Sequence, residues 1–133
     1  MDDITKIKLF GEQPVSKISD DLLSRLIARD FKHSADIVSA KLKKVNSNSQ
    51  EGENRISACI LKLANQDINA LYRLIEKANI DYRDIIMMAE YPRNAKIGFD
   101  DLDEETMKQI YIDDFVEYSN WLNESHNNEQ HES

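Results

Sequence analysis

The sequence predicts an all-α fold, an irregular bundle of five or six short helices in a single domain. Three observations support this prediction. The chain has 133 residues, which is enough for one hydrophobic core. It contains only three glycines and two prolines, so few turn signals interrupt it. Its apolar residues recur every three or four positions, which is the period of an amphipathic helix.

Residues 1–18 are expected to form an N-terminal arm. Segment 4–10 fits either a short strand or an irregular stretch, and Gly11 and Pro14 interrupt the chain after it. A first helix is expected to begin at Ser19 or Asp20, since either side chain can cap it. A second helix is expected after residue 34, and the polar segment 46–52 is predicted to be a flexible connection.

Residues 56–63 show the clearest helical period, with four apolar side chains on one face: Ile56, Cys59, Ile60 and Leu63. Another helix is predicted over residues 68–78, closed at Asn79. Asp81 can cap a short fifth helix. Pro92 is expected to end that helix, because proline disfavours helical geometry in the residue before it.

The last predicted helix follows the acidic run 99–105, because acidic residues stabilise a helix N-terminus. Its apolar stripe is expected to face the core: Met107, Tyr111, Phe115, Tyr118 and Leu122. Replacing Phe115 with alanine is therefore expected to cost about 3–5 kcal/mol. The helices define a helical domain over residues 19–122, followed by a polar tail, 123–133, that is expected to be disordered.

Charge is unevenly distributed along the chain. The formal net charge is −8, and residues 99–133 hold eleven acidic residues and one basic residue, a net charge of −10. This disfavours nucleic acid and anionic membranes as partners. DNA binding through the basic second predicted helix would face repulsion from the acidic C-terminal region. No apolar run approaches the roughly 20 residues of a membrane span, and the acidic N-terminus is unlike a signal peptide, so a cytoplasmic location is expected.

The acidic C-terminal region has two interpretations. Its carboxylates either rest across six basic residues within the molecule (Arg25, Arg29, Lys32, Lys41, Lys43 and Lys44) or form a docking face for a basic protein. The residues of this predicted acidic face are Asp103, Glu104, Asp113, Asp114 and Glu117. Such a face would accelerate association more than it deepens affinity.

The sequence predicts no catalytic residue, no metal site and no cofactor. The single cysteine, Cys59, lies on an apolar stripe and has no partner for a disulfide or a thiolate zinc site. The three histidines lack the spacing of metal ligands. With three glycines in the chain, a phosphate-binding loop is nearly excluded.

The densest polar and aromatic cluster consists of Tyr82, Arg83, Asp84, Glu90, Tyr91 and Arg93. In one interpretation Asp84 and Glu90 form an acid–base pair of a small enzyme, or help to line a ligand site. In the other, which we favour, these charges form structural ion pairs. Arg83 and Glu90 are seven residues apart and share a helix face, while Asp81 and Asp84 have the spacing of a capping box.

Just over half of the chain resembles a small family of uncharacterised bacterial helical proteins. The segments Cys59–Ala64, Asp81–Ile86 and Ala89–Pro92 carry this resemblance, together with the later Ile110-Tyr111, Asp114-Phe115, Tyr118 and Trp121-Leu122. The resemblance implies a bacterial, intracellular origin and carries no activity.

These observations favour a non-enzymatic protein-interaction module. An immunity or antitoxin-type inhibitor that presents an acidic face to a basic protein fits the charge pattern best, and a weak homodimer is compatible with it. The alternative is a small enzyme or ligand-binding protein that uses the cluster from Asp81 to Arg93.

Overall fold

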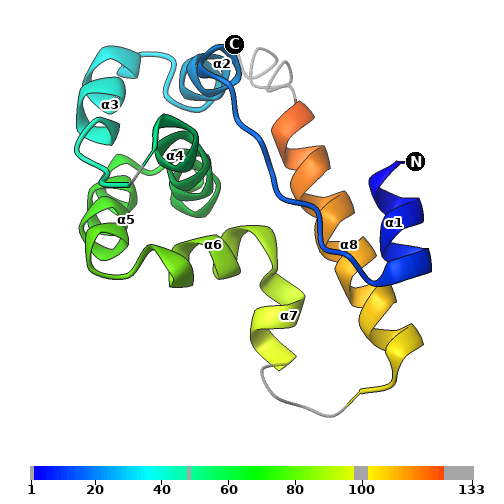
Figure 1. Ribbon diagram of the computed structural model, residues 1–133. Coiled ribbons are helices and arrows are strands. Elements are labelled where there is room, and N and C mark those ends of the chain that lie inside the picture. Colours follow the sequence, from blue (N-terminus) through cyan, green and yellow to red (C-terminus); the bar gives the residue numbers. More distant parts are fainter. Residues whose placement is uncertain (1, 48, 98–101, 125–133) are drawn as a thin grey trace.

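The computed structural model describes residues 2–47, 49–97 and 102–124. All regular secondary structure in these ranges is helical, which confirms the all-α fold (Figure 1). The helices are α1 (Asp3–Phe10), α2 (Asp20–Asp30), α3 (Ala35–Leu42), α4 (Gln50–Ala64), α5 (Ile68–Ile80), α6 (Tyr82–Glu90), α7 (Pro92–Ile97) and α8 (Glu104–Asn123). The described ranges thus contain eight helices, and the expected five or six were too few because α1 and α7 were not anticipated.

Helix α1 replaces the expected strand or irregular segment. The Asp2 carboxylate accepts a hydrogen bond from the Thr5 backbone N–H (2.7 Å), which caps the start of the helix. Gly11 ends it at φ 67°, in the left-handed region, and its N–H donates to the Ile7 carbonyl (2.9 Å). These two caps close a helix of only eight residues, whose apolar content had suggested a strand.

Helix α7 lies where a loop was expected. Pro92 follows the end of α6, as predicted, but it is also the first residue of α7. Proline suits this position because its ring fixes a helical φ and its missing N–H would have no intrahelical partner. The stretch up to Ile97 is therefore helical, and the expected polar tail lies outside the described residues from 125 onward.

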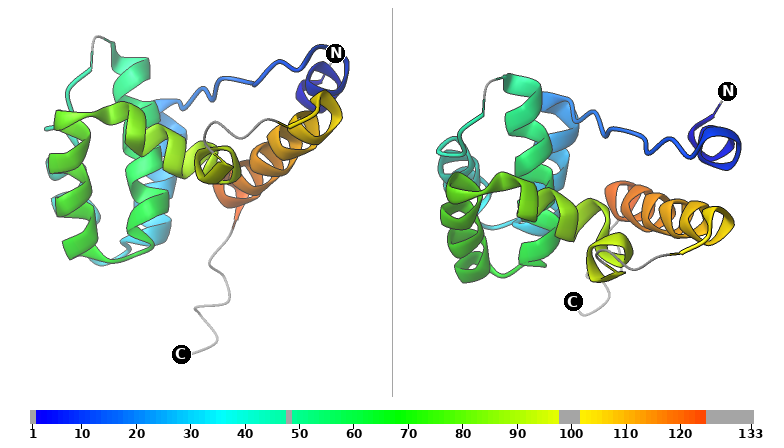
Figure 2. Two further views of the ribbon diagram at one scale, coloured as in Figure 1. Left: turned by 90° about the horizontal axis from the view of Figure 1, so that it is seen from below. Right: turned by 60° about the horizontal axis from the view of Figure 1, so that its bottom comes forward.

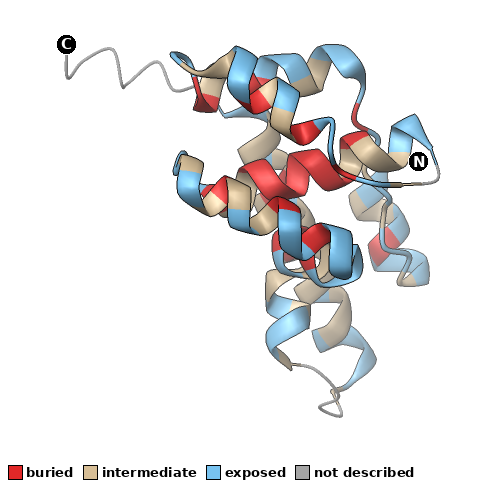
Figure 3. Ribbon diagram, turned by 90° about the vertical axis from the view of Figure 1, so that its left-hand side faces the viewer, coloured by how far each residue is buried: buried red, intermediate tan, exposed pale blue. Residues whose placement is uncertain are grey.

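Helices α2 to α6 surround one hydrophobic core, with α4 at its centre (Figure 3). Eight residues of α4 are buried, among them Ile56, Ile60 and Leu61. Ser19 and Asp81 act as the predicted N-caps of α2 and α6. Helix α4 begins at residue 50, inside the segment expected to be a flexible connection, because the Ser49 hydroxyl caps it.

Helix α8 lies beside this body, against α1 on one side and against α6 and α7 on the other (Figures 1 and 2). Arg29 of α2 binds the C-terminal end of α8. The guanidinium donates to the carbonyls of Trp121 (2.7 Å) and Glu124 (2.9 Å) and lies over the Trp121 ring. A cation here meets the negative end of the helix dipole.

The apolar stripe of α8 is less buried than the sequence suggested. Tyr118 is buried, whereas the other four members are only half-buried: Met107, Tyr111, Phe115 and Leu122. The reason is geometric, because the first half of α8 extends past the core of α2 to α6 and has mainly α1 and α7 as neighbours (Figure 1).

The Phe115→Ala variant is accordingly expected to lose about 1–2 kcal/mol of unfolding free energy, because the ring removes less surface from water than a core ring does. Urea denaturation measures this loss. Leu71→Ala, at a fully buried position, serves as the control and is expected to lose about 2–5 kcal/mol. Equal losses in the two variants would place Phe115 in the core and contradict this expectation.

Candidate functional site

The cluster predicted from residues 82 to 93 does not gather around one cavity. Arg83 is exposed and its Nε donates to the Asp81 carboxylate (3.4 Å) at the surface. Tyr82 and Asp84 are also exposed. Glu90, by contrast, points into the protein and is 3% exposed. Arg83 and Glu90 are thus ion-paired with different partners, and no joint acid–base site forms.

Glu90 forms a two-point ion pair with Arg55 of α4, which sequence reasoning missed. Arg55 Nε donates to Glu90 Oε2 (3.0 Å) and Arg55 Nη2 donates to Glu90 Oε1 (2.9 Å). The hydrogen bond that Arg55 donates to Glu90 raises the pKa of Arg55 above its ordinary value. The fork geometry matches the two carboxylate oxygens, so the charge of Glu90 is balanced inside the fold.

Two further buried groups, the Cys59 thiol and the Tyr118 hydroxyl, lie beside this ion pair. We call these four residues the polar centre. The Cys59 thiol donates to Glu90 Oε2 (3.5 Å) and lies 3.8 Å from the Tyr118 hydroxyl. Burial raises the pKa of the Cys59 thiol and of the Tyr118 hydroxyl well above their ordinary values. The thiol therefore stays protonated at neutral pH and is a poor nucleophile.

Asp114 does not belong to an accessible acidic face, because it is completely buried. Its Oδ1 accepts from the Arg93 backbone N–H (3.1 Å) and guanidinium (3.1 Å), and its Oδ2 accepts from the Asn94 N–H (3.3 Å). Asp114 of α8 thus caps the start of α7 from 20 residues further along the chain. It was expected at the surface, but its role in the structure is to join two helices.

Glu117 is half-exposed and already ion-paired within the molecule. Lys62 donates to it (2.6 Å) and so does Arg93 (3.2 Å), and the hydrogen bond from Lys62 lowers the pKa of Glu117 below its ordinary value. Lys62 also donates to the Ala89 carbonyl (2.6 Å). Three carboxylates of α8 thus pair with internal cations, Glu117 with Lys62 and Arg93, Asp114 with Arg93, and Glu104 with Lys108. None of these cations is among the six basic residues suggested by the sequence.

Of the remaining predicted acidic residues, Asp103 and Glu104 are exposed at the start of α8, and Asp113 is half-buried near its middle. Asp103 caps the helix by accepting from the Thr106 N–H (2.7 Å), and this bond lowers its pKa. Glu104 pairs with Lys108 one turn on (3.4 Å), and Asp113 accepts from a neighbouring glutamine. With Glu105, which is exposed as well, the first turn forms what we call the acidic end: residues 103–105.

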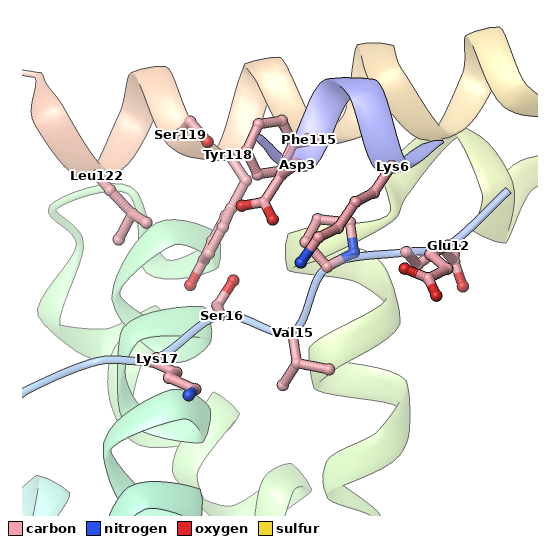
Figure 4. Close-up of a pocket in the computed structure, with 12 residues that line it drawn as sticks. Asp3, Lys6, Glu12, Val15, Ser16, Lys17, Phe115, Tyr118, Ser119 and Leu122 are labelled. Atoms are coloured by element: carbon pink, nitrogen blue, oxygen red, sulfur yellow. The ribbon is translucent and has the colours of Figure 1, made fainter. Parts of the chain in front are cut away.

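A groove with a volume of about 630 Å³ lies between α1, α8 and the extended segment that follows α1 (Figure 4). Phe115 and Tyr118 line it from α8, and Asp3 and Lys6 line it from α1. Its charged side chains have both signs, so it offers no single charged ligand a matched set of partners.

One sequence signal could have revealed that Arg55 and Lys62 are internal cations: they are charged residues on an otherwise uncharged stretch of helix. Arg55 and Lys62 are the only charged residues between 54 and 66, they are seven positions apart, and they share a face with Cys59. A charge on a face that must be buried requires a buried counter-charge. The sequence does not say which carboxylate supplies it.

Comparisons with known proteins add no functional assignment. The chain matches no family model, no curated protein and no solved structure, so its resemblance to a bacterial helical family stays a prediction. Among the described residues, no three acidic, histidine or cysteine side chains are grouped as metal ligands would be. In the same residues, each helix is too short or too polar to span a membrane.

Proposed function

We propose that this protein is a non-enzymatic interaction module that binds a basic partner protein through the acidic end of α8, as an immunity or antitoxin-type inhibitor would. The observation that carries the proposal is the exposure of three consecutive carboxylates at residues 103–105. They lie at the end of the molecule away from α2 and α3 (Figure 1). The exposed cations of that other region are Arg25 of α2, Lys32 between α2 and α3, and Lys43 and Lys44 just after α3.

The state of the polar centre supports an interaction module over an enzyme. Glu90 is charge-balanced by Arg55, and the Cys59 thiol is held protonated by burial. A general base or nucleophile needs access to a substrate in a cavity. Each buried side-chain nitrogen or oxygen in the described residues has a hydrogen-bond partner within the protein, so the polar groups of the interior serve the fold.

Neutralising the acidic end is expected to slow binding of the partner. The variant combines Glu104→Gln and Glu105→Gln in the acidic end with Asp113→Asn further along α8, and it spares Asp103 because that side chain caps α8. The partner is first captured on the wild-type protein from the native cell, and association rates are then measured by surface plasmon resonance. We expect about a tenfold lower association rate, with a weaker dependence on salt.

The control variant carries the same loss of three charges elsewhere: Asp36→Asn, Glu51→Gln and Glu76→Gln, all at exposed positions on α3 to α5. Its association rate is expected to match that of the wild type after correction for net charge. Equal effects in the two variants would show that net charge alone matters, and would refute a specific acidic face. The inhibitor role is tested by co-expression, since a partner that stays equally toxic with and without this protein is not its target.

A further inference from the structure

The segment that connects α1 to α2 is an unusually open part of the chain. We call residues 12–17 the strap. Four of its six side chains are exposed: Glu12, Gln13, Val15 and Lys17. One hydrogen bond holds the strap and another holds the residue that follows it. The Pro14 carbonyl accepts from the Tyr91 hydroxyl (3.2 Å), and the Ile18 carbonyl accepts from the Asn54 side chain (3.1 Å). Figure 2 shows the strap running apart from the body of α2 to α6.

The strap and the end of α1 expose large apolar side chains. Leu9 is 57% exposed, Phe10 is 63% exposed and Val15 is 62% exposed. Helix α1 itself is held by α8 and has one fully buried side chain, Ile7. Neighbouring apolar side chains left in water on a small protein are typical of a surface that another molecule covers.

The charges of the strap indicate which molecule that is. Glu12 and Lys17 lie at its two ends and carry opposite charge, and within the described residues neither forms an ion pair. A twofold axis between Pro14 and Val15 would make two straps antiparallel. Each Glu12 would then face Lys17 of the second copy. The strap is thus complementary to itself under the commonest symmetry of protein dimers.

We propose that two copies of this chain associate through their straps in a weak, twofold-symmetric dimer. Two Glu12–Lys17 ion pairs flank the contact, and Val15 of each copy packs against Pro14 of the other copy at its centre. Phe10 lies just before the strap, beyond the turn at Gly11, and extends the apolar contact. This surface begins beside the acidic end of α8, because Gly11 lies close to Lys108, the ion-pair partner of Glu104. The test therefore measures self-association of the purified chain, with no partner protein present.

Sedimentation equilibrium over a concentration series tests the dimer. The wild type is expected to pass from the 15.4 kDa chain to twice that mass, with a dissociation constant on the order of 100 μM for so small a contact. Glu12→Lys or Lys17→Glu alone should weaken the dimer about tenfold or more, because like charges then face each other. Both positions are exposed, so unchanged circular dichroism and melting temperature confirm an intact fold.

Recombining the charges makes the test specific. The double variant Glu12→Lys/Lys17→Glu should recover the dimer, and an equimolar mixture of the two single variants should form a heterodimer. Lys8→Glu, an equal reversal at an exposed position of α1, should leave the dimer unchanged. A wild type that stays monomeric throughout refutes the proposal, and a dimer insensitive to both single reversals assigns association to another surface and refutes it too.

Discussion

Replacing Arg55 with alanine is expected to lower the free energy of unfolding by about 3–5 kcal/mol, the usual cost of leaving a buried charge without its partner. Glu90 is 3% exposed and would lose the guanidinium that balances its charge, while keeping the Cys59 thiol as a donor. Urea denaturation monitored by circular dichroism measures the loss.

The reverse truncation separates charge burial from lost packing. Glu90→Ala leaves the Arg55 guanidinium, whose side chain is 23% exposed and can turn toward water, so its cost is expected to be smaller, about 1–3 kcal/mol. The double variant Arg55→Met/Glu90→Leu replaces the pair by apolar groups and should approach wild-type stability, within about 2 kcal/mol. If Arg55→Ala costs no more than Glu90→Ala, the buried carboxylate is not the source of the loss.

Asp114→Ala is expected to cost about 2–4 kcal/mol, because it leaves two backbone N–H groups of α7 and the Arg93 guanidinium without their acceptor. Helix α7 has six residues, too few to be stable without tertiary support. We therefore expect hydrogen exchange to accelerate in α7 well before the core of α4. Denaturation and exchange measured on the same sample check both effects.

The neighbouring acidic residue supplies the control for Asp114. Asp113→Asn removes the same charge from a side chain that accepts a hydrogen bond from the nearby Gln109, and it should change stability by less than about 0.5 kcal/mol. If Asp114→Ala is equally mild, the cap on α7 is energetically unimportant. If Asp114→Ala instead weakens partner binding and leaves stability unchanged, Asp114 belongs to the partner-binding acidic face.

Much of the helical order could be predicted because it depends on residues close together in the chain. The apolar spacing of Ile56, Cys59 and Ile60 marked the central helix, and Asp81 marked the start of α6. The same kind of information was present at α1, where Asp2 and Gly11 provide both caps. These caps did not decide the prediction, because the apolar pattern of residues 4–10 also fits a strand. A segment this short satisfies both the helical and the strand period.

The candidate site was harder to predict because its contacts join distant parts of the chain. The sequence places Glu90 in a local cluster with Arg83 and Arg93. Its ion-pair partner in the structure is Arg55, 35 residues earlier. Asp114 was taken as one of five similar carboxylates, although it is buried and Glu104 is exposed. Helical spacing places residues on faces, but it does not say which face of another helix they meet.

The sequence by itself determined the all-α class, most helix boundaries and the acidic character of the C-terminal region, because propensity, capping and apolar periodicity act over one or two turns. Only the tertiary structure decided which charges are buried and paired. A carboxylate on α8 becomes a helix cap, an ion-pair partner or a free surface charge according to what packs beside it. Burial raises the cost of an unpaired charge far above its cost in water, so the packing of α4, α6, α7 and α8 assigns each acidic side chain its role.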